Sequence, residues 1–403
     1  MKRVFVLASG LITAAAVCAQ ASQKIISFET AYRGAIDKNI EEVGGKVTRK
    51  FTLIDSVVAI FPDNAKTDAI MSIKGVTAVY EDKYRKWLNE APVSLSAVQF
   101  PSVKEIIAKA RSGEGWNRPA PFATRPSETE IPWGVKRVNA SAAWGTLTGK
   151  GVKVCIIDTG VDGNHPDLAP NYKGGYNAVV STEPPTDEHG HGTHVAGTIA
   201  AALNDKGVVG VAPNAEIYGV KVLGKDGYGQ DSWVAAGVEW AIMNHMNVTN
   251  MSLGDKEESV PLKQMMEKAD QAGITQVVAA GNLMTFWGTC PVMYPAKYDV
   301  AIAISASDSS DKIASFSCRG PEVDLIAPGA RINSTKPGGG YQTMDGTSMA
   351  CPHVAGLAAL AVNAGAKTPA EVRAALVKAA SPLAGLRPEE EGAGLVNAAK
   401  LLK

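Results

Sequence analysis

Residues 152–160, Val-Lys-Val-Cys-Ile-Ile-Asp-Thr-Gly, indicate the fold class of this chain. The run from Val152 to Ile157 is apolar, as expected of a strand that is buried on both faces. Further strand-like runs follow at 217–222, 248–251, 274–280 and 300–304. Helical stretches alternate with them at 195–203, 233–246, 262–272, 353–363 and 369–379. This alternation predicts an α/β fold with a mostly parallel central sheet flanked by helices.

The tripeptide Asp158-Thr159-Gly160 directly follows the first of these strands. In a parallel sheet the carboxyl ends of the strands line the functional crevice, so Asp158 is expected there. A carboxylate in that place can orient a histidine and stabilise its charged form. Because Asp-x-Gly is also common in turns after strands, the tripeptide alone does not define a site.

A heptapeptide rich in glycine and histidine, residues 191–197, leads into a helical stretch. A histidine at that entry can project into the crevice as a general base, and His191 is the candidate. The cluster of His189, His191 and His194 could instead bind a metal ion. However, the helical i, i+4 spacing with a nearby carboxylate, as in H-E-x-x-H zinc sites, is absent. A histidine that caps the helix or lies in the core is the other alternative.

Residues 346–353, Gly-Thr-Ser-Met-Ala-Cys-Pro-His, place Ser348 at the start of a helix. A serine in that position is usually an N-cap. The position also suits a nucleophile, because the helix dipole and the first backbone N–H groups favour an oxyanion. Pro352 costs little in the first turn, where N–H groups have no helical partner.

Together, and in the order Asp, His, Ser, the segments 158–160, 191–197 and 346–352 resemble the signature segments of the subtilisin-like serine peptidases. Two further stretches, 233–254 and 279–282, share the likeness, which extends over residues 131–403. The resemblance implies a serine endopeptidase that hydrolyses peptide bonds of proteins through an acyl-enzyme intermediate. It implies protein or peptide substrates and no organic cofactor.

The resemblance also assigns roles to four residues. Ser348 would be the nucleophile, His191 would take its proton and later deliver it to the leaving amine, and Asp158 would orient His191. Asn282 would donate a side-chain hydrogen bond to the oxyanion, beside the backbone N–H of Ser348. The alternative for Asn282 is a turn cap after Gly281.

Two segments resemble the edges between which the family holds its substrate as an added strand. These expected substrate-binding residues are Lys225, Asp226 and Gly227 on one edge, Ser252, Leu253 and Gly254 on the other, and Ala280 and Gly281 in the pocket wall. The pocket floor is expected within 283–294, which departs most from the family. The side chain preferred at the cleavage site is therefore not predicted.

A structural calcium ion is a further expectation from the resemblance. The expected ligands are Asp167, Leu203 and Asp205. The loop 203–208 is one residue shorter than its counterpart, and the family's glutamine ligand has no equivalent near Thr129. A carboxylate and carbonyls still suit a hard cation.

The N-terminal third divides into three parts. Residues 1–21 have the charged start, apolar stretch and Ala-x-Ala ending of a signal peptide, which predicts a secreted protein, periplasmic before its release. Lipidation at Cys18 is the alternative, and it would need a small residue where Val17 stands. Residues 22–85 show a small α+β pattern that resembles the family's inhibitory propeptide, and 86–130 read as a proline-punctuated linker. The peptidase domain is expected at 131–403.

Composition narrows the range of partners. The chain has 40 basic and 40 acidic residues and is 45% hydrophobic, which indicates a globular core and disfavours nucleic acid or an anionic membrane as a partner. We expect a monomer. Export permits disulfides, and Cys290 with Cys318 is the favoured pair, although sequence does not fix the connectivity. Cys155 and Cys351 resemble buried free cysteines.

Two rival interpretations remain at this point. The chain could be an inactive relative that captures peptides in the same cleft, or a peptidase inhibitor fused to a spent enzyme. Both require a damaged site. The presence of Asp158, His191, Asn282 and Ser348 argues against them.

Overall fold

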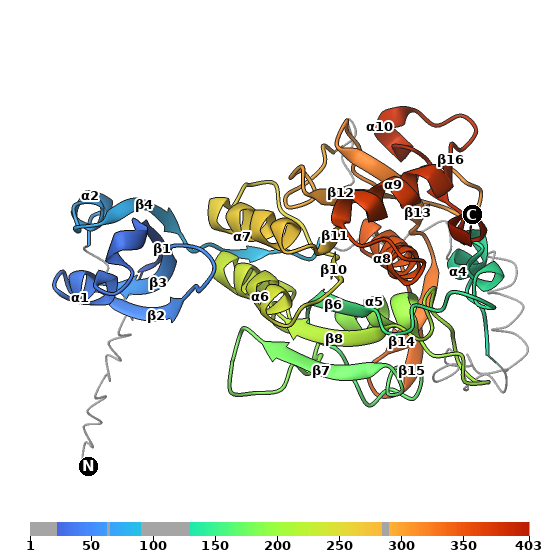
Figure 1. Cartoon of the computed structure of the whole chain (residues 1–403), viewed down its shortest axis with the longest axis horizontal. Helices are drawn as coiled ribbons and strands as arrows, with labels where there is room; N and C mark the ends of the chain where they lie inside the picture. Colours follow the sequence, from blue (N-terminus) through green and yellow to red (C-terminus); the bar gives the residue numbers. More distant parts are fainter. Residues whose placement is uncertain (1–21, 63–64, 90–128, 284–289, 403) are drawn as a thin grey trace, which may run out of the picture. The chain divides into compact units, whose positions relative to one another are not determined.

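The computed structural model describes residues 22–62, 65–89, 129–283 and 290–402. The chain forms two compact units, which are considered separately (Figure 1). The first comprises residues 1–50 and 55–82, and the second comprises residues 51–54 and 83–403.

The first unit contains a four-stranded antiparallel sheet in the order β2-β3-β1-β4. Its elements are β1 (Ser22–Phe28), η1 (Thr30–Tyr32), α1 (Ile36–Glu41), β2 (Lys46–Lys50), β3 (Ser56–Phe61), α2 (Thr67–Met71) and β4 (Val76–Glu81). Apolar side chains of the strands and the two helices, such as Ile26, Ile40, Phe61 and Ile70, form one core. The expected α+β pattern is present. Strand β2, which alternates exposed and half-buried side chains, was not anticipated.

The second unit is built on a nine-stranded sheet in the order β16-β17-β13-β12-β11-β10-β6-β8-β7. All its pairings are parallel except β16 with β17, which confirms the predicted α/β class. The strands are β6 (Lys153–Asp158), β7 (Tyr172–Asn177), β8 (Glu216–Lys221), β10 (Val248–Met251), β11 (Thr275–Ala279), β12 (Ala301–Ser307), β13 (Val323–Pro328), β16 (Ala380–Ser381) and β17 (Leu395–Val396).

The strand order reverses at β6. The chain adds β8 and β7 on one side of β6 and then returns to place β10 on the other. In open parallel sheets, such a reversal creates a crevice beyond the carboxyl ends of the strands, where ligands bind. Asp158, the last residue of β6, therefore lies at the mouth of this crevice.

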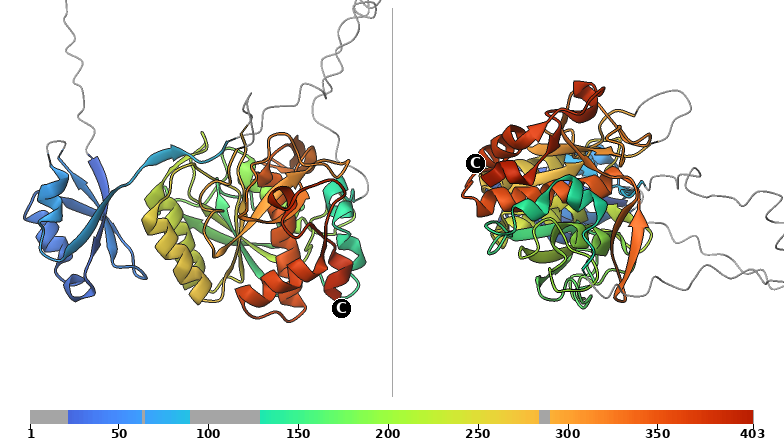
Figure 2. Two further views of the ribbon diagram at one scale, coloured as in Figure 1. Left: turned by 90° about the horizontal axis from the view of Figure 1, so that it is seen from above. Right: turned by 90° about the vertical axis from the view of Figure 1, so that its right-hand side faces the viewer.

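Helices cover both faces of the sheet, with α6 (Asp231–Met243) and α7 (Val260–Gln271) on one side and α8 (Thr347–Asn363) on the other (Figures 1 and 2). The remaining helical segments are α4 (Trp133–Arg137), η3 (Ala140–Ala142), α5 (His191–Ala200), α9 (Pro369–Ala379), α10 (Pro388–Glu391) and η4 (Ala398–Leu402). Two short antiparallel pairs lie outside the main sheet: β14 (Ile332–Lys336) with β15 (Gly340–Met344), and β5 (Tyr84–Lys86) with β9 (Tyr228–Gln230).

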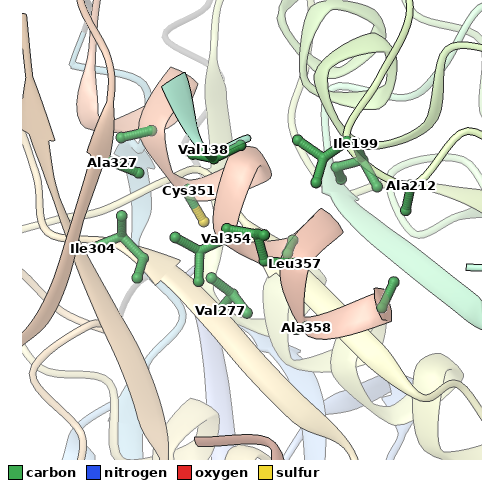
Figure 3. Packing of buried hydrophobic residues seen from close by; sticks show 14 of the residues in the cluster. Val138, Ile199, Ala212, Val277, Ile304, Ala327, Cys351, Val354, Leu357 and Ala358 are labelled. Atoms are coloured by element: carbon green, nitrogen blue, oxygen red, sulfur yellow. The ribbon is translucent and has the colours of Figure 1, made fainter. Parts of the chain in front are cut away.

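Helix α8 lies at the centre of the hydrophobic core. It is buried from Thr347 to Ala361, and its small and branched side chains pack between the sheet and α5. Figure 3 shows Val354 and Leu357 among Val277, Ile304 and Ile199. A helix that is apolar on every face is stable only when surrounded in this way.

The described cysteines pair as expected. Cys290 and Cys318 form a disulfide with a Cα–Cα distance of 4.7 Å, which confirms the favoured pairing. Cys155 and Cys351 are free and buried, and burial raises the pKa of both thiols. Among the described residues, no helix has the length and apolar character needed to cross a membrane.

Candidate active site

Asp158 and His191 form a buried pair at the mouth of the crevice. His191 Nδ1 lies 2.8 Å from Asp158 Oδ1 and 3.0 Å from Oδ2. A carboxylate only accepts hydrogen bonds, so Nδ1 carries the proton and Nε2 is the atom that can accept one. The backbone N–H of Thr159 also donates to Asp158 Oδ1, at 2.7 Å. This arrangement fixes both the ring orientation and the tautomer of His191.

The start of α5 is held in place by Asp187, a residue that the sequence analysis did not single out. Its Oδ1 accepts the backbone N–H groups of His189 and Gly190 at 3.0 and 2.8 Å, and the hydroxyl of Thr159 at 2.8 Å. Its Oδ2 accepts the backbone N–H and hydroxyl of Thr193 at 2.9 and 2.6 Å. Asp187 therefore connects the turn after β6 to the helix that carries His191.

Ser348 occupies the first turn of α8 and is 9% exposed. Its Oγ donates a hydrogen bond to the carbonyl oxygen of Ser252 at 3.1 Å. The Oγ of Ser252 in turn donates to the carbonyl oxygen of Ser348 at 2.8 Å. These reciprocal bonds join the end of β10 to the start of α8 and hold the two serines together.

Asn282 follows β11 and points its amide group into the crevice. Its Oδ1 accepts the backbone N–H and the hydroxyl of Thr347, at 2.8 and 2.9 Å. The hydroxyl of Thr347 accepts the N–H of Gly281 at 3.1 Å. With Oδ1 occupied by two donors, Nδ2 is directed outward, and it donates to the carbonyl oxygen of Asn89 at 2.7 Å.

A segment of the chain itself, residues 84–89, lies between the two predicted substrate-binding edges. Strand β5 pairs antiparallel with β9, with Arg85 opposite Gly229. Beyond the strand, the N–H groups of Trp87 and Leu88 donate to the carbonyl of Gly227, at 3.1 and 3.3 Å. On the other side, the N–H of Gly254 donates to the carbonyl of Trp87 at 3.0 Å.

This segment crosses the boundary expected between residues 22–85 and 86–130. The backbone pairing with β9, a non-local contact, explains why the local composition did not reveal it. Of the predicted edge residues, Gly227 and Gly254 form hydrogen bonds with the backbone of the segment, and Asp226 Oδ2 accepts the hydroxyl of Tyr84 at 3.4 Å. Lys225 and Asp226 are exposed on the turn, where Asp226 Oδ1 accepts the N–H of Tyr228 at 3.1 Å.

Met293 lies within the stretch 283–294 in which the pocket floor is expected, and it packs against Gly281. Its Cγ lies 2.6 Å from the position that a Cβ on Gly281 would take, so this glycine leaves room for the methionine. The Nδ2 of Asn89 reaches the carbonyl of Gly254 at 3.2 Å and Met293 Sδ at 4.0 Å. The wall residue Ala280 accepts the N–H of Met293 at 2.9 Å. Residues 284–289 lie outside the described residues.

The other histidines near the site are structural. His194 Nε2 contacts the carbonyls of Ile332 and Gln342, at 3.0 and 3.2 Å, on the far side of α5. His353 Nδ1 contacts the carbonyl of Met349 at 2.8 Å. Burial lowers the pKa of His194 to about 3 and that of His353 to about 4. Within the part of the chain that the structure describes, no three His, Cys, Asp or Glu side chains group as metal ligands.

Asp167 is buried beside the loop 203–208. Its Oδ2 accepts the N–H of Val208 at 3.0 Å and the hydroxyl of Tyr341 at 2.9 Å, and its Oδ1 lies 3.3 Å from Asn204 Nδ2. The Oδ1 of Asn204 is buried without a hydrogen-bond partner among the described residues, and an amide oxygen is a ligand that suits a hard cation. The side chains of Leu203, which is 55% exposed, and Asp205 point to solvent. Asn204 was missed as a candidate ligand.

Comparison with known proteins gives the family of this chain. A model described as the subtilase family matches residues 149–395, and the chain belongs to this family. It is 44% identical to subtilisin E of Bacillus subtilis over 302 residues, which are 74% of this chain and 76% of the relative.

Further subtilisins give similar values. Subtilisin J of Geobacillus stearothermophilus is 48% identical over 302 residues, 74% of this chain and 76% of the relative. A subtilisin of Bacillus pumilus is 50% identical over 235 residues, 58% of this chain and 85% of the relative. The chain is therefore a serine endopeptidase of the subtilase family, as the resemblance implied.

We predict that Asn282→Ala lowers kcat about 10²–10³-fold, a value taken from a subtilisin, and changes KM much less, because the lost bond strengthens only in the transition state. Thr347→Val, which removes one of the two bonds that orient Asn282, should lower kcat by up to about tenfold. Thr347→Ser is the matched control and should retain the rate. The measurements are kcat and KM on a chromogenic peptide, normalised by active-site titration. A Thr347→Val variant with wild-type kcat would contradict the orienting role.

We predict that acid destabilises the fold through His194 and His353. In the unfolded chain each histidine binds a proton below its ordinary pKa of 6.5. In the folded protein His194 stays neutral down to about pH 3 and His353 down to about pH 4. The unfolded state therefore binds more protons in this window. Stability is full above pH 6.5 and falls as the pH drops towards 4, by at most about 1.4 kcal/mol per pH unit for each histidine.

Thermal unfolding of the Ser348→Ala protein between pH 8 and pH 4.5 checks this prediction without autolysis. His353→Asn should make the decline in Tm shallower. The exposed His245→Gln is the control and should leave the slope unchanged. An unchanged slope in His353→Asn would show that other groups cause the acid sensitivity.

Proposed function

We propose that this endopeptidase is made as an exported zymogen that cuts itself and then hydrolyses proteins through Asp158, His191, Ser348 and Asn282. One observation carries the proposal: Asn282 Nδ2 donates to the carbonyl oxygen of Asn89 at 2.7 Å. A scissile carbonyl would receive the same hydrogen bond, because an amide donor in this place stabilises the oxyanion that forms on attack. Residues 84–89 therefore occupy the cleft as a substrate would.

The reaction uses the side chains in a fixed order. Ser348 Oγ attacks the carbonyl carbon of the bound residue, and its proton moves to His191 Nε2. Asp158 stabilises the imidazolium through Nδ1–H. Asn282 Nδ2 and the backbone N–H of Ser348 hold the tetrahedral oxyanion.

Two bond cleavages complete the cycle. The C–N bond breaks, the leaving amine takes the proton from His191, and an acyl-enzyme ester remains on Ser348. His191 then removes a proton from water, which attacks the ester carbonyl. The ester bond to Oγ breaks, Ser348 regains its proton, and the substrate leaves with a new carboxylate.

The same hydrogen bond supports self-processing. In this proposal the bond after Asn89 is the one that Ser348 attacks, so the first cut would separate residues up to Asn89 from the chain that begins at Glu90. The propeptide would then extend to residue 89, rather than to 85 as the sequence suggested. Removal of the predicted signal peptide, residues 1–21, would accompany export.

The two rival interpretations require a site that binds but does not react. Against them stand the Asp158–His191 pair, at 2.8 Å, and the orientation of Asn282 by Thr347. A reagent that labels reactive serines separates the interpretations, since only an active site labels at Ser348.

We predict that the wild-type chain, expressed with its export signal, digests casein and yields a secreted product that begins at Glu90, as measured by intact mass and N-terminal sequencing. Ser348→Ala should do neither, because it lacks the nucleophile, and it should retain residues 22–89. A mass that places the first cut elsewhere would contradict the placement of Asn89.

The outcomes separate the hypotheses. If both proteins stay full-length and inert, the cleft only binds and the catalytic proposal fails. If both digest casein equally, Ser348 is the wrong serine or a contaminant is responsible. Mixing a small amount of active enzyme with the Ser348→Ala protein shows whether the same bond can also be cut between molecules.

We further propose that the family's structural calcium ion binds here at Asp167. The carboxylate of Asp167 and the buried Oδ1 of Asn204 are suitable hard ligands, and carbonyls of the loop that contains Leu203 and Asp205 would complete the set. The ion would stabilise the loop and takes no part in the reaction.

We predict that saturating calcium raises the Tm of the Ser348→Ala protein by about 5 °C or more over chelator, because an ion that binds only the folded state stabilises it by mass action. Asp167→Asn, in the same background, should lose this response. Magnesium at equal concentration is the control, since it prefers a smaller octahedral site. A calcium response that persists in Asp167→Asn would place the ion elsewhere.

A further inference from the structure

We propose that the substrate cleft contains an arginine-selective subsite formed by Asp231 and Asp255, which binds the substrate side chain four residues before the one whose carbonyl is attacked. The inference rests on the proposed function, in which residues 84–89 occupy the cleft as a substrate. In that segment Arg85 stands four residues before Asn89. The proposed subsite would make the enzyme prefer substrates that carry a basic residue four positions before the residue whose carbonyl is attacked.

The side chain of Arg85 is enclosed by the enzyme. Its Nη2 donates to Asp231 Oδ2 at 2.7 Å, and its Nη1 donates to Asp255 Oδ1 at 2.8 Å and to the carbonyl of Glu257 at 3.0 Å. The side chains of Arg85 and Asp231 are only 7% and 3% exposed, and that of Asp255 is 24% exposed. Asp231 and Asp255 thus form an enclosed pocket for the guanidinium group. An exposed ion pair, in contrast, would add little to the free energy of binding.

The charge balance of the pocket requires a cation. Burial acts to lower the pKa of Arg85, but the hydrogen bonds and negative charges of Asp231 and then Asp255 outweigh it, so the pKa is raised. The carboxylate of Glu257, 3.9 Å from Nη1, adds further negative charge and also pairs with Lys83. A neutral substrate side chain would leave at least two carboxylates in this enclosed place without a cation, which is costly.

The two carboxylates belong to the enzyme and are held independently of Arg85. Asp231 is the first residue of α6. Asp255 follows β10, and its backbone forms two hydrogen bonds with Tyr294, at 2.8 and 2.9 Å. Asp255 Oδ1 also accepts the N–H of Glu257 at 2.9 Å. Both acids therefore remain beside the cleft after the N-terminal segment leaves.

The geometry favours arginine over lysine. The acceptors Asp231 and Asp255 lie on different segments, and two nitrogens of one guanidinium reach them separately. A planar fork with several N–H groups can do this, whereas an ammonium group is a single point charge. The guanidinium also lies over the ring of Trp87, with 5.6 Å between its carbon and the ring centroid, which adds a cation–π contact.

The experiment uses the mature enzyme and internally quenched peptides that contain the sequence of residues 83–91, Lys-Tyr-Arg-Lys-Trp-Leu-Asn-Glu-Ala. Three peptides carry Arg, Lys or Leu at the place of Arg85. The readout is the ratio of kcat/KM values between peptides for one enzyme, so the fraction of folded enzyme cancels. We expect the Arg peptide to be cleaved roughly 30-fold or more better than the Leu peptide, with the Lys peptide between them.

Enzyme variants assign the preference to the two acids. In Asp231→Asn with Asp255→Asn, the Arg-to-Leu ratio should fall to within about threefold. In Asp255→Arg, at the more exposed position, the ratio should fall and a peptide with Glu at this place should become better than the Arg peptide. Misfolding could lower the rates for all peptides, but it could not make the variant prefer the Glu peptide over the Arg peptide.

Equal cleavage of the Arg and Leu peptides by the wild-type enzyme would overturn the inference and leave the proposed function standing. So would a ratio that is unchanged in the double variant. Failure to cleave any of the peptides, together with no labelling of Ser348 by a serine reagent, would overturn the proposed function and this inference with it.

Discussion

The burial of helix α8 is the constraint on which the active site depends. The helix is apolar on every face, so the sheet, α5 and the surrounding loops must enclose it. Packing on all sides fixes the position of the first turn of α8, which carries both Thr347 and Ser348. Thr347 then orients Asn282, and Ser348 is tied to Ser252 at the end of β10. Core packing thus places Ser348, which we propose as the nucleophile, and Asn282, which we propose as the oxyanion donor.

A second set of contacts positions Asp158 and His191 where the strand order reverses. Asp158 ends β6, and Asp187 holds the start of α5 against the turn that follows. His191 is therefore positioned by a strand end and a helix start that both lie at the switch in strand order. None of the three proposed triad residues lies in a long loop, which is consistent with a site that must keep its geometry while substrates of different sequence bind.

The sequence revealed those features that are local. Apolar runs such as 152–157 predicted the buried strands. The short motifs around Asp158 and His191 predicted two side chains that lie within hydrogen-bond distance, and the motif around Ser348 predicted a serine at the start of a helix. Features that depend on distant segments could not be read in this way. The packing of Met293 against Gly281 is one such feature. Arg85 meets Asp231 and Asp255 across more than 140 positions of sequence. Asn204 was overlooked because only the orphaned oxygen in the folded loop draws attention to it.

The covalent link between residues 84–89 and the enzyme has a consequence in reaction order. While the chain is intact, filling of the cleft by its own segment is a first-order event, and it does not depend on how much protein is present. If the bond after Asn89 is cut as we propose, the same contacts describe a complex of two molecules, and occupancy then depends on concentration. In a confined compartment the cut segment would stay bound, and release into a large volume would empty the cleft. Dilution itself would then set the time and place at which the enzyme starts to act on other proteins.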